Sequence, residues 1–391
     1  MTDTGPRNAP GVVDVVDVVD VVDVVALGES MVTFVPSGPG RLADVPRFER
    51  GIGGAESNVA CVLASAGHAV RWVSRVGADA FGDHLLAAIG SHGVDVSSVR
   101  RDPGRPTGVY FRTAGDRATD AHEVAYYRAG SAASAMDVAS VDLTAARACR
   151  VLHLSGITAA LSQGCLTLLH ELLRPAPDRP LISFDVNYRP GLWRDDEGGR
   201  ALLELARAAD IVFVGEDEAR EAWGVTGGPE AIRELLPEPG VLVVKDGARG
   251  ATVFERACLS TGSRAAGAAP VPQKAGTRSA PGRATHPRPT TTPVTFEPAL
   301  NVTVVATTGA GDAFAAGFLS ATLRGLPVAA RLRHGHLTAA AALTVPGDLA
   351  PPPSRDHADR LAALDNASWG RLRLGPGWTR AEPAPEEVRT P

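Results

Sequence analysis

The sequence has few cysteines, and their spacing excludes two common kinds of site. The four are Cys61, Cys149, Cys165 and Cys258. Structural zinc sites and thiol redox motifs need closely spaced cysteine pairs, which this chain lacks. We therefore expect reduced thiols in a cytoplasmic protein and no disulfide framework.

A large excess of positive charge is also missing. The formal net charge is −5 over 391 residues. Proteins that bind nucleic acids generally carry a basic surface, so this weak acidity argues against a nucleic-acid partner. The length allows a large core, arranged as one elaborated α/β domain or as two domains.

The most apolar stretch near the N-terminus is interrupted by acids. Copies of Val-Val-Asp carry Asp14, Asp17, Asp20 and Asp23. Each aspartate at the centre of a bilayer costs roughly 2.5–3.5 kcal/mol, which excludes a membrane-spanning helix. The first residues, MTDTGPRNAP, lack the features of a signal peptide. We interpret residues 1–20 as a low-complexity extension, expect residues 21–27 to form the first buried strand, and predict no membrane association.

No Gly-x-Gly-x-x-Gly motif follows that first strand; GESMVTF does, which disfavours a Rossmann dehydrogenase. Further apolar runs alternate with helical patterns, which predicts an α/β fold with a doubly wound, mostly parallel sheet and helices on both faces. Functional residues of such folds lie at the carboxyl ends of strands. The expected strands are 24–27, 70–73, 151–154, 181–185, 211–214 and 241–245, and the expected helices include 198–209 and 230–236.

Two regions depart from this pattern. Residues 31–50 and 105–130 alternate like short strands, and we expect them to form a small β-sheet lid over the mouth of the main domain. Residues 256–298 offer little apolar material, which predicts a disordered insertion whose basic residues are solvated. The main domain then spans residues 21–375, and residues 376–391 are predicted to be a loose tail.

The most informative motif is TTGAGDAFAAGF at residues 307–318. Backbone N–H groups of Gly309, Ala310 and Gly311 at a helix start form an anion site, and glycines let a phosphate approach closely. A carboxylate repels that anion, so Asp312 makes sense if it takes a proton from a hydroxyl that attacks the phosphate. From this motif alone, the alternative is that Asp312 is only a helix N-cap.

A second segment, GIGGAESNVACVLASAGHAVRWVSRVGADAFGD at residues 51–83, contains Asn58, Gly67 and Gly77. Together and in this order, the two segments resemble the two signatures of the ribokinase-like (PfkB) sugar kinases. The resemblance implies a ribokinase-like fold and phosphoryl transfer from ATP with Mg²⁺. It also implies that Asp312 is the general base, and that the lid is often a homodimer contact.

Within that family, GGAESN, YYRAGSAASA, LHLSGITAALS, FDVNYRPGLW and VKDGARG are similar to kinases of the sugar acid 2-keto-3-deoxygluconate. An acid substrate calls for arginine, which binds a carboxylate bidentately. Tyr126 and Arg128 lie two apart on a lid strand and so share a face, and Arg189 follows the strand 181–185. The resemblance places around the sugar acid Gly54, Asn58, Tyr110, Tyr126, Arg128, Ile157 and Arg189.

The resemblance also implies a nucleotide side. Glu218 matches the glutamate of an Asn-x-x-Glu motif that helps place Mg²⁺ through water, although Gly215 stands at the asparagine position. Ala306 replaces an aspartate that is a ligand in relatives activated by a monovalent cation. The residues implied to bind nucleotide are Glu218, Lys245, Gly247, Gly250, Gly309, Gly311 and His336. Related sequences often carry asparagine at the position of His336, so this chain could prefer a nucleotide other than ATP.

Ordinary structural roles compete with several of these assignments. The tyrosines could only pack the lid, Arg189 could pair with Asp185 or Asp195, and Glu218 could be an exposed acid in a first helical turn. Lys245 either steadies phosphates or is an ordinary residue at a strand end. Competing functions are a fructokinase or other neutral-sugar kinase, and a sugar-binding regulatory protein without kinase activity.

Overall fold

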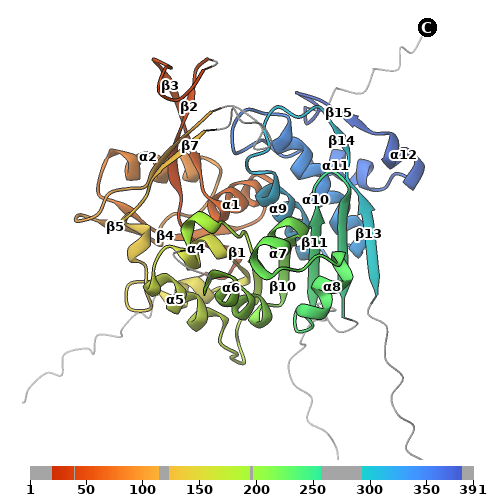
Figure 1. Cartoon of the computed structure of the whole chain (residues 1–391), viewed down its shortest axis with the longest axis horizontal. Coiled ribbons are helices and arrows are strands. Elements are labelled where there is room, and N and C mark those ends of the chain that lie inside the picture. Colours follow the sequence, from red (N-terminus) through yellow and green to blue (C-terminus); the bar gives the residue numbers. More distant parts are fainter. Residues whose placement is uncertain (1–19, 39, 114–122, 194–196, 257–292, 381–391) are drawn as a thin grey trace, which may run out of the picture.

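The computed structural model describes residues 20–38, 40–113, 123–193, 197–256 and 293–380. Within these ranges a nine-stranded sheet crosses the molecule in the order β13-β12-β11-β10-β9-β8-β1-β4-β5 (Figure 1). The neighbouring strands from β11 to β5 in this order pair in parallel, whereas β12 pairs antiparallel with both β11 and β13. All six expected strands are confirmed. The strands are β1 Val22–Leu27, β4 Val70–Gly77, β5 Val99–Asp102, β8 Cys149–Ser155, β9 Leu181–Asp185, β10 Ile211–Gly215, β11 Val241–Asp246, β12 Gly250–Glu255 and β13 Val294–Pro298.

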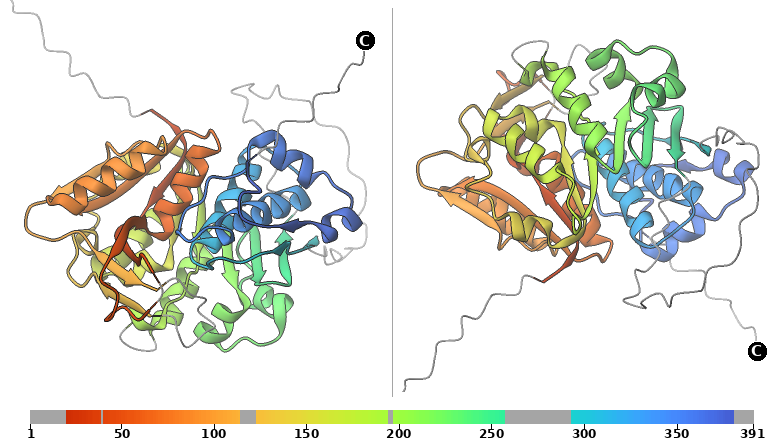
Figure 2. Two further views of the ribbon diagram at one scale, coloured as in Figure 1. Left: turned by 90° about the horizontal axis from the view of Figure 1, so that it is seen from above. Right: turned by 90° about the horizontal axis from the view of Figure 1, so that it is seen from below.

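The parallel strands read as continuous apolar runs because both faces of the sheet are covered. Successive side chains of β1 point to opposite faces: Val25 and Leu27 belong to one buried cluster, and Val24 and Ala26 belong to another. Each cluster packs against its own layer of helices, and Figure 2 shows these layers on the two sides of the sheet. The predicted doubly wound α/β architecture is therefore confirmed.

One helix layer contains α3 Leu143–Arg147, α4 Gly156–Ala160, α5 Gln163–Leu173, α6 Glu197–Ala208, α7 Glu216–Trp223 and α8 Gly228–Leu235. The other contains α1 Ala55–Ser65, α2 Ala80–Ser91, α9 Ala310–Leu323, α10 Val328–Leu343, α11 Arg355–Ala362 and α12 Asn366–Arg371. No helix in the described part of the chain is long and apolar enough to cross a membrane. Cys61, Cys149 and Cys165 are buried free thiols, and Cys258 lies outside the described residues.

The predicted lid is a separate four-stranded sheet of order β3-β2-β6-β7, which projects beside the main sheet (Figure 1). Its strands are β2 Met31–Pro36, β3 Phe48–Gly53, β6 Val109–Arg112 and β7 Val124–Tyr127. Phe34 on β2 stacks on Phe111 of β6 with ring centroids 4.9 Å apart, so aromatic side chains hold the two parallel strands together.

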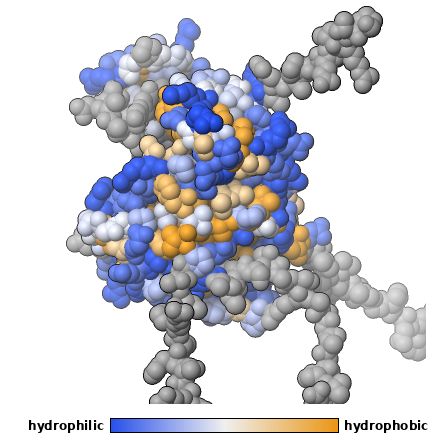
Figure 3. Space-filling view, turned by 90° about the vertical axis from the view of Figure 1, so that its right-hand side faces the viewer, coloured by the Kyte–Doolittle hydropathy of each residue, from blue (hydrophilic) through white to orange (hydrophobic). Residues whose placement is uncertain are grey.

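One boundary of the predicted insertion is wrong. Residues 257–292 lie outside the described ranges, but Val294–Pro298 forms strand β13, which pairs with β12 at the edge of the large sheet. The apolar side chains of this edge strand stay at the surface: Val294 is 53% and Phe296 54% exposed. Figure 3 faces this edge and shows apolar groups there. Sequence analysis missed the strand because its flanks are rich in proline and the side chain that it buries is the charged Glu297.

The predicted loose tail also begins too early. A short parallel pair, β14 Asn301–Val302 with β15 Arg373–Leu374, precedes it. Trp378, within the predicted tail, packs against a third apolar cluster that contains Leu337 and Trp369. One partly buried aromatic ring is enough to order a terminal segment, and no periodic pattern in the sequence predicts it. Residues 381–391 lie outside the described part.

Candidate active site

A cavity of about 460 Å³ lies between the lid sheet and the carboxyl ends of the parallel strands. Met31 and Tyr126 line it from the lid, and Asp185 lines it from the end of β9. Doubly wound sheets bind ligands at this edge. Most residues that the sequence singled out reach the cavity: Gly54, Asn58, Tyr110, Tyr126, Arg128, Ile157, Arg189, Glu218, Lys245, Gly309, Gly311 and Asp312.

Asp312 lies in the first turn of α9, and Gly309 is the N-cap residue of that helix. Gly309 has φ +78°, a left-handed conformation that favours glycine. The side chain of Asp312 makes no cap hydrogen bond; its Oδ2 accepts one from Asn58 Nδ2 at 2.8 Å. The interpretation of Asp312 as a simple N-cap is therefore wrong, and its carboxylate lines the cavity.

The surroundings of Asp312 raise its pKa to about 7. Burial is the main cause, because it disfavours the ionised carboxylate, and the nearby charge of Asp185 adds to it. The hydrogen bond from Asn58 acts in the opposite direction. A carboxylate with a pKa near neutral pH is suited to accept and release a proton.

Lys245 and Asp185 form an ion pair at the floor of the cavity, with 3.1 Å between Nζ and Oδ2. Burial by itself lowers the pKa of Lys245, but the charges of Asp185 and Glu218 outweigh it and the pKa is raised. Lys245 is therefore a permanent positive charge, which the Asp312 carboxylate also favours. Charge and position distinguish it from an ordinary solvated lysine at a strand end.

Glu218 is enclosed, and the prediction of an exposed acid does not hold. Its Oε2 accepts from the backbone N–H of Gly215 at 2.8 Å, and its Oε1 lies 3.4 Å from Arg189 Nη1. Burial raises the pKa of Glu218, and Asp185 contributes. The partner of Arg189 is thus Glu218, whereas Asp185 was one of the two expected partners; Asp195 lies outside the described residues.

Arg128 also has an acidic partner, which sequence reasoning missed. Its Nη2 pairs with Glu29 Oε2, and Glu29 Oε1 accepts a hydrogen bond from Ser131. Glu29 is 2% exposed and follows β1 directly, so it lies at the carboxyl end of a strand. The rule that functional residues follow the carboxyl ends of strands could have identified Glu29 from the sequence. The Arg128 guanidinium carbon lies 5.9 Å from the ring centre of Tyr126, which is half exposed, so this tyrosine is not simply packed in the lid.

Tyr110 is buried, and its hydroxyl donates to Asp348 Oδ2. Asp348 follows α10 and lies 238 residues away in the sequence. No motif or period marks it, so sequence analysis had no signal for this residue. Asn187 is a further residue that was missed: it follows β9, lines the cavity and has φ +40°, a strained conformation for a residue other than glycine.

Several buried polar atoms of cavity residues have no hydrogen-bond partner among the described residues. Buried polar groups are normally paired, so each such atom needs an explanation. They lie around one space, which indicates a polar ligand with both donors and acceptors. The atoms are Asn58 Oδ1, Arg128 Nε, Asn187 Oδ1 and Thr307 Oγ1.

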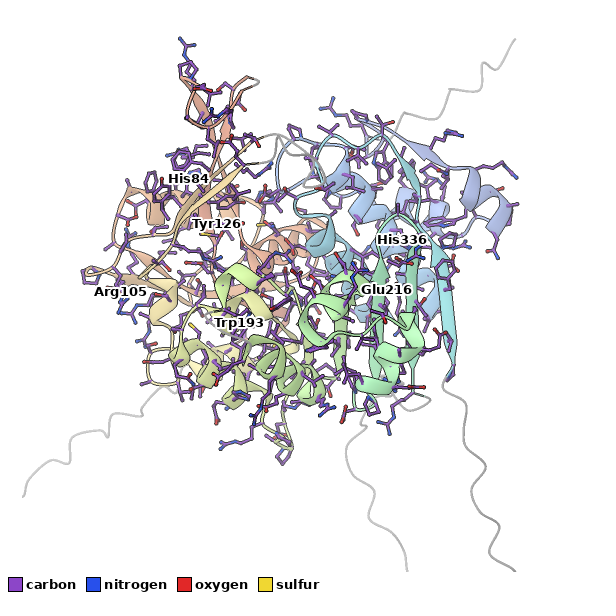
Figure 4. All side chains as sticks on the ribbon, in the orientation of Figure 1. His84, Arg105, Tyr126, Trp193, Glu216 and His336 are labelled. Atoms are coloured by element: carbon purple, nitrogen blue, oxygen red, sulfur yellow. The ribbon has the colours of Figure 1, made fainter. Side chains whose placement is uncertain are left out.

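Four predicted site residues do not line the cavity. Ala310 lies in the first turn of α9. Gly247 and Gly250 lie in and just after the β11–β12 turn with φ of +51° and +147°, which confirms their turn role alone. His336 does not line the cavity either: it is 7% exposed, its Nε2 lies 3.1 Å from the Glu297 carbonyl oxygen, and burial lowers its pKa to about 4. Figure 4 shows His336 among the C-terminal helices, away from Tyr126 on the lid.

His153 is a buried residue of the central sheet, and its Nδ1 lies 3.0 Å from Ser183 Oγ. Ala306 is buried and supplies no carboxylate to a monovalent cation. In the described ranges, no three His, Cys, Asp or Glu side chains converge as a metal cage.

Comparison with known proteins now adds to this geometry. The family model described as pfkB family carbohydrate kinase matches residues 22–275 and 290–355. The 2-dehydro-3-deoxygluconokinase of Thermoproteus tenax is 33% identical over 341 residues, which cover 86% of this chain and 93% of that protein. A probable chloroplastic fructokinase-6 of Arabidopsis thaliana is 29% identical over 305 residues, 76% of this chain and 69% of that protein. Among solved structures, the PfkB protein of Polaromonas sp. JS666 has a TM-score of 0.69 and 32% identity, covering 88% of this chain and 100% of that one.

Proposed function

This chain belongs to the pfkB family of carbohydrate kinases, and from that premise we propose that it phosphorylates a sugar acid with ATP. The proposed substrate is 2-keto-3-deoxygluconate, also called 2-dehydro-3-deoxygluconate, and the proposed product is its 6-phosphate. The observation that carries this proposal is that Arg128 lines the same cavity as Asp312, with a guanidinium that has more donors than its one ion pair, with Glu29, uses. A substrate carboxylate could accept from the remaining donors.

Asp312 is the proposed base. The terminal hydroxyl of the sugar acid gives its proton to the Asp312 carboxylate while its oxygen attacks the γ-phosphorus of ATP. The bond between that phosphorus and the bridging β,γ-oxygen breaks, and ADP leaves with the electron pair. Asn58, which donates to Asp312 Oδ2 at 2.8 Å, keeps the carboxylate oriented toward the cavity. Such general-base assistance contributes about 10²–10⁴ in rate.

The transferring phosphate is held by the first turn of α9 in this mechanism. Backbone N–H groups of Gly309 and Gly311 precede the first intrahelical bonds and can donate, whereas that of Ala310 already lies 3.5 Å from the Thr307 carbonyl oxygen. Lys245 adds a positive charge close to this turn, since a Cβ atom on Gly311 would lie 3.7 Å from its Nζ. Phosphoryl transfer depends mainly on such positioning and charge stabilisation.

The donor set at the cavity floor fits magnesium. Mg²⁺ usually keeps several waters and takes one or two carboxylates together with substrate phosphates. Asp185 and Glu218 both line the cavity, and the charge of the first raises the pKa of the second, which places the two carboxylates near each other. These two residues would hold the ion through water. When bound, Mg²⁺ neutralises charge on the phosphates.

Arg128 and Arg189 are the proposed ligands of the substrate carboxylate. Each guanidinium has five N–H donors, and the partners Glu29 and Glu218 engage only part of them. The carboxylates of Glu29 and Glu218 fix the orientation of the two guanidinium groups, and the remaining N–H donors are available to the ligand. The lid residues Tyr110 and Tyr126, with Gly54 and Ile157, complete the proposed sugar site.

A neutral-sugar kinase is the second candidate. Fructokinases are among the relatives, and both cavity arginines already have an acidic partner in the protein. In that case the arginines serve structure, and the substrate carries no carboxylate.

The test is ADP release with magnesium-ATP and four sugars: 2-keto-3-deoxygluconate, gluconate, fructose and ribose. We expect turnover with the ketodeoxy acid and loss of it in Asp312→Asn. Preference for fructose or ribose would overturn the assignment of the arginines and keep the kinase. Near-normal turnover in a folded Asp312→Asn variant would overturn the base.

A further inference from the structure

The side chain of Asp348 connects the lid to the main domain. Its Oδ2 accepts a hydrogen bond from the Tyr110 hydroxyl, and its Oδ1 accepts one from Arg112 Nη2 at 2.6 Å. Tyr110 and Arg112 lie two residues apart on β6, so both point to the same face of the lid sheet. Arg112 Nη2 also donates to the carbonyl of Pro346 at 2.9 Å. One short loop after α10 thus holds one lid strand at three points.

These contacts are out of water and therefore hold a single arrangement. Asp348 is 7% exposed and Arg112 is 2% exposed. A charge at such depth is stable only with its partner, so the two residues cannot separate at little cost. Burial, reinforced by the charge of Asp348, raises the pKa of Tyr110 well above its ordinary value, and the phenol keeps the proton that it donates.

The backbone of Asp348 meets the proposed phosphate site. A Cβ atom on Gly309 would collide with the Asp348 carbonyl oxygen and lie 3.4 Å from its Cα. The Gly309 carbonyl accepts the N–H of Ala313 at 2.9 Å and so closes the first turn of α9. The residue whose side chain holds β6 therefore supports, with its main chain, the turn that begins α9.

A third segment joins the same point. Gly53 ends β3 and precedes the cavity residue Gly54, and a Cβ atom on Gly53 would lie 2.6 Å from Asp348 Oδ2. Lid strands β3 and β6 thus pack against the side chain of Asp348, and the turn at Gly309 packs against its main chain, without room for an added methyl group on Gly53 or Gly309.

We propose that Asp348 is a positioning residue that couples the lid to the phosphate-binding turn of α9. A displacement of β6 is transmitted through Tyr110 and Arg112 to Asp348, and from its main chain to Gly309. Occupation of the turn by a phosphate therefore orders the lid, and the lid in turn orders the N–H groups that face the phosphate. The inference rests on the proposed function only in taking the Gly309 turn as the phosphate site.

Hydrogen exchange of the full chain, with and without magnesium-ADP, tests this coupling. The two reporter peptides cover residues 106–113 of the lid and residues 306–314 of the turn. In the wild type, magnesium-ADP should slow exchange in both peptides. In Asp348→Asn it should still slow exchange in the turn peptide, while the response of the lid peptide falls at least about fivefold. No sugar is needed, so an error in the proposed substrate leaves the result unaffected.

A matched control is Asp102→Asn, which breaks the ion pair of another buried aspartate, the one with the partly exposed Arg75 at 2.8 Å. It should keep the wild-type lid response. If Asp348→Asn does not fold, the double variant Asp348→Leu/Arg112→Leu removes both charges and should show the same loss. A lid response in Asp348→Asn equal to that of the wild type would overturn the coupling. A wild-type turn that does not respond to magnesium-ADP would instead overturn the phosphate site itself.

Discussion

Asn58 Nδ2 donates a hydrogen bond of 2.8 Å to Asp312 Oδ2 across 254 residues of sequence. The bond joins the first turns of α1 and α9. The two glycine-rich signatures of the sequence are therefore two sides of one site. Asn58 also lowers the pKa of the carboxylate that burial raises, so the same contact orients the proposed base and tunes it.

The pH dependence of turnover should follow Asp312. Because its pKa is raised to about 7, kcat should rise about tenfold per pH unit below that value and level off above it. Removing the amide in Asn58→Ala removes an interaction that favours the ionised form, so the midpoint should move to higher pH. Measuring kcat between about pH 5.5 and pH 9 decides this. An unchanged or lower midpoint would show that Asn58 does not tune the base.

Replacing Asp312 with asparagine should lower kcat by about 10²–10⁴, because asparagine cannot accept the proton. The control is Asp365→Asn, which alters a helix-capping aspartate that accepts from Ser368 N at the start of the distant helix α12. Its turnover should stay near that of the wild type. Equal losses in the two variants would point to helix stability and not to proton transfer.

The same substitution should stabilise the fold at high pH. The Asp312 pKa is about 7 in the folded protein against 3.8 for a free side chain. Between these values the folded state binds more protons than the unfolded state, so stability falls as the pH rises. Asparagine has no carboxylate to ionise, so the variant does not lose this stability as the pH rises. We expect Asp312→Asn to raise the free energy of unfolding by about 1–4 kcal/mol at pH 8 and to give no gain at pH 4. Urea unfolding at both pH values measures it, and an equal gain at both would contradict the raised pKa.

Arg128→Ala and Arg189→Ala should each reduce kcat/KM selectively for acid sugars. The lost charge-assisted bonds correspond to about 2–5 kcal/mol where the pair is buried. Arg105, labelled in Figure 4, is an exposed arginine near the lid that does not line the cavity, and Arg105→Ala is the control. Similar losses for fructose and for the sugar acid would favour the neutral-sugar alternative.

Glu29→Gln should make stability depend on the ligand. It removes the charge that neutralises buried Arg128, so the free protein should lose about 1–3 kcal/mol of stability. A substrate carboxylate supplies the missing charge, and the rise in Tm on adding the sugar acid should exceed that of the wild type.

Glu171→Gln is the control for this variant, since Glu171 pairs with Arg147 outside the cavity. It should show the wild-type rise in Tm. If Glu29→Gln also shows only the wild-type rise, Arg128 does not bind the carboxylate.

Two glycines with positive φ allow the effect of backbone strain to be distinguished from the effect of a steric clash next to the cavity. Gly325 has φ +70° and open space where a Cβ would lie, whereas Gly309 has φ +78° and the Asp348 carbonyl there. Gly325→Ala should cost about 1–2 kcal/mol of stability and leave kcat unchanged. Gly309→Ala should cost more and also reduce kcat, which unfolding and turnover measurements show. Equal effects on kcat would contradict a special role for this turn.

Sequence analysis predicted the parallel sheet well because its signal is local. Each buried strand, such as 211–214, is a short apolar run between turn residues, and its β-branched side chains suit a sheet covered on both faces. Strand β13 was missed because its apolar side chains are exposed and the side chain that it buries, Glu297, is charged, so no apolar alternation marks it. The nucleotide role of His336 came from the family resemblance and stays a prediction, because similarity of position does not tell whether a ring points into a cavity or into the core.

The sequence by itself determined the α/β class, the lid strands, the first turn of α9 and about half of the residues that line the cavity. These depend on short-range periodicity, on glycine conformations and on motifs that a single segment carries. Only the tertiary structure decided the partners of the charged groups: Glu29 for Arg128, Glu218 for Arg189, and Asp348 for Tyr110 and Arg112. Pairing and burial set the charge of each group, and both arise between segments far apart in the chain, where sequence spacing holds no information about distance.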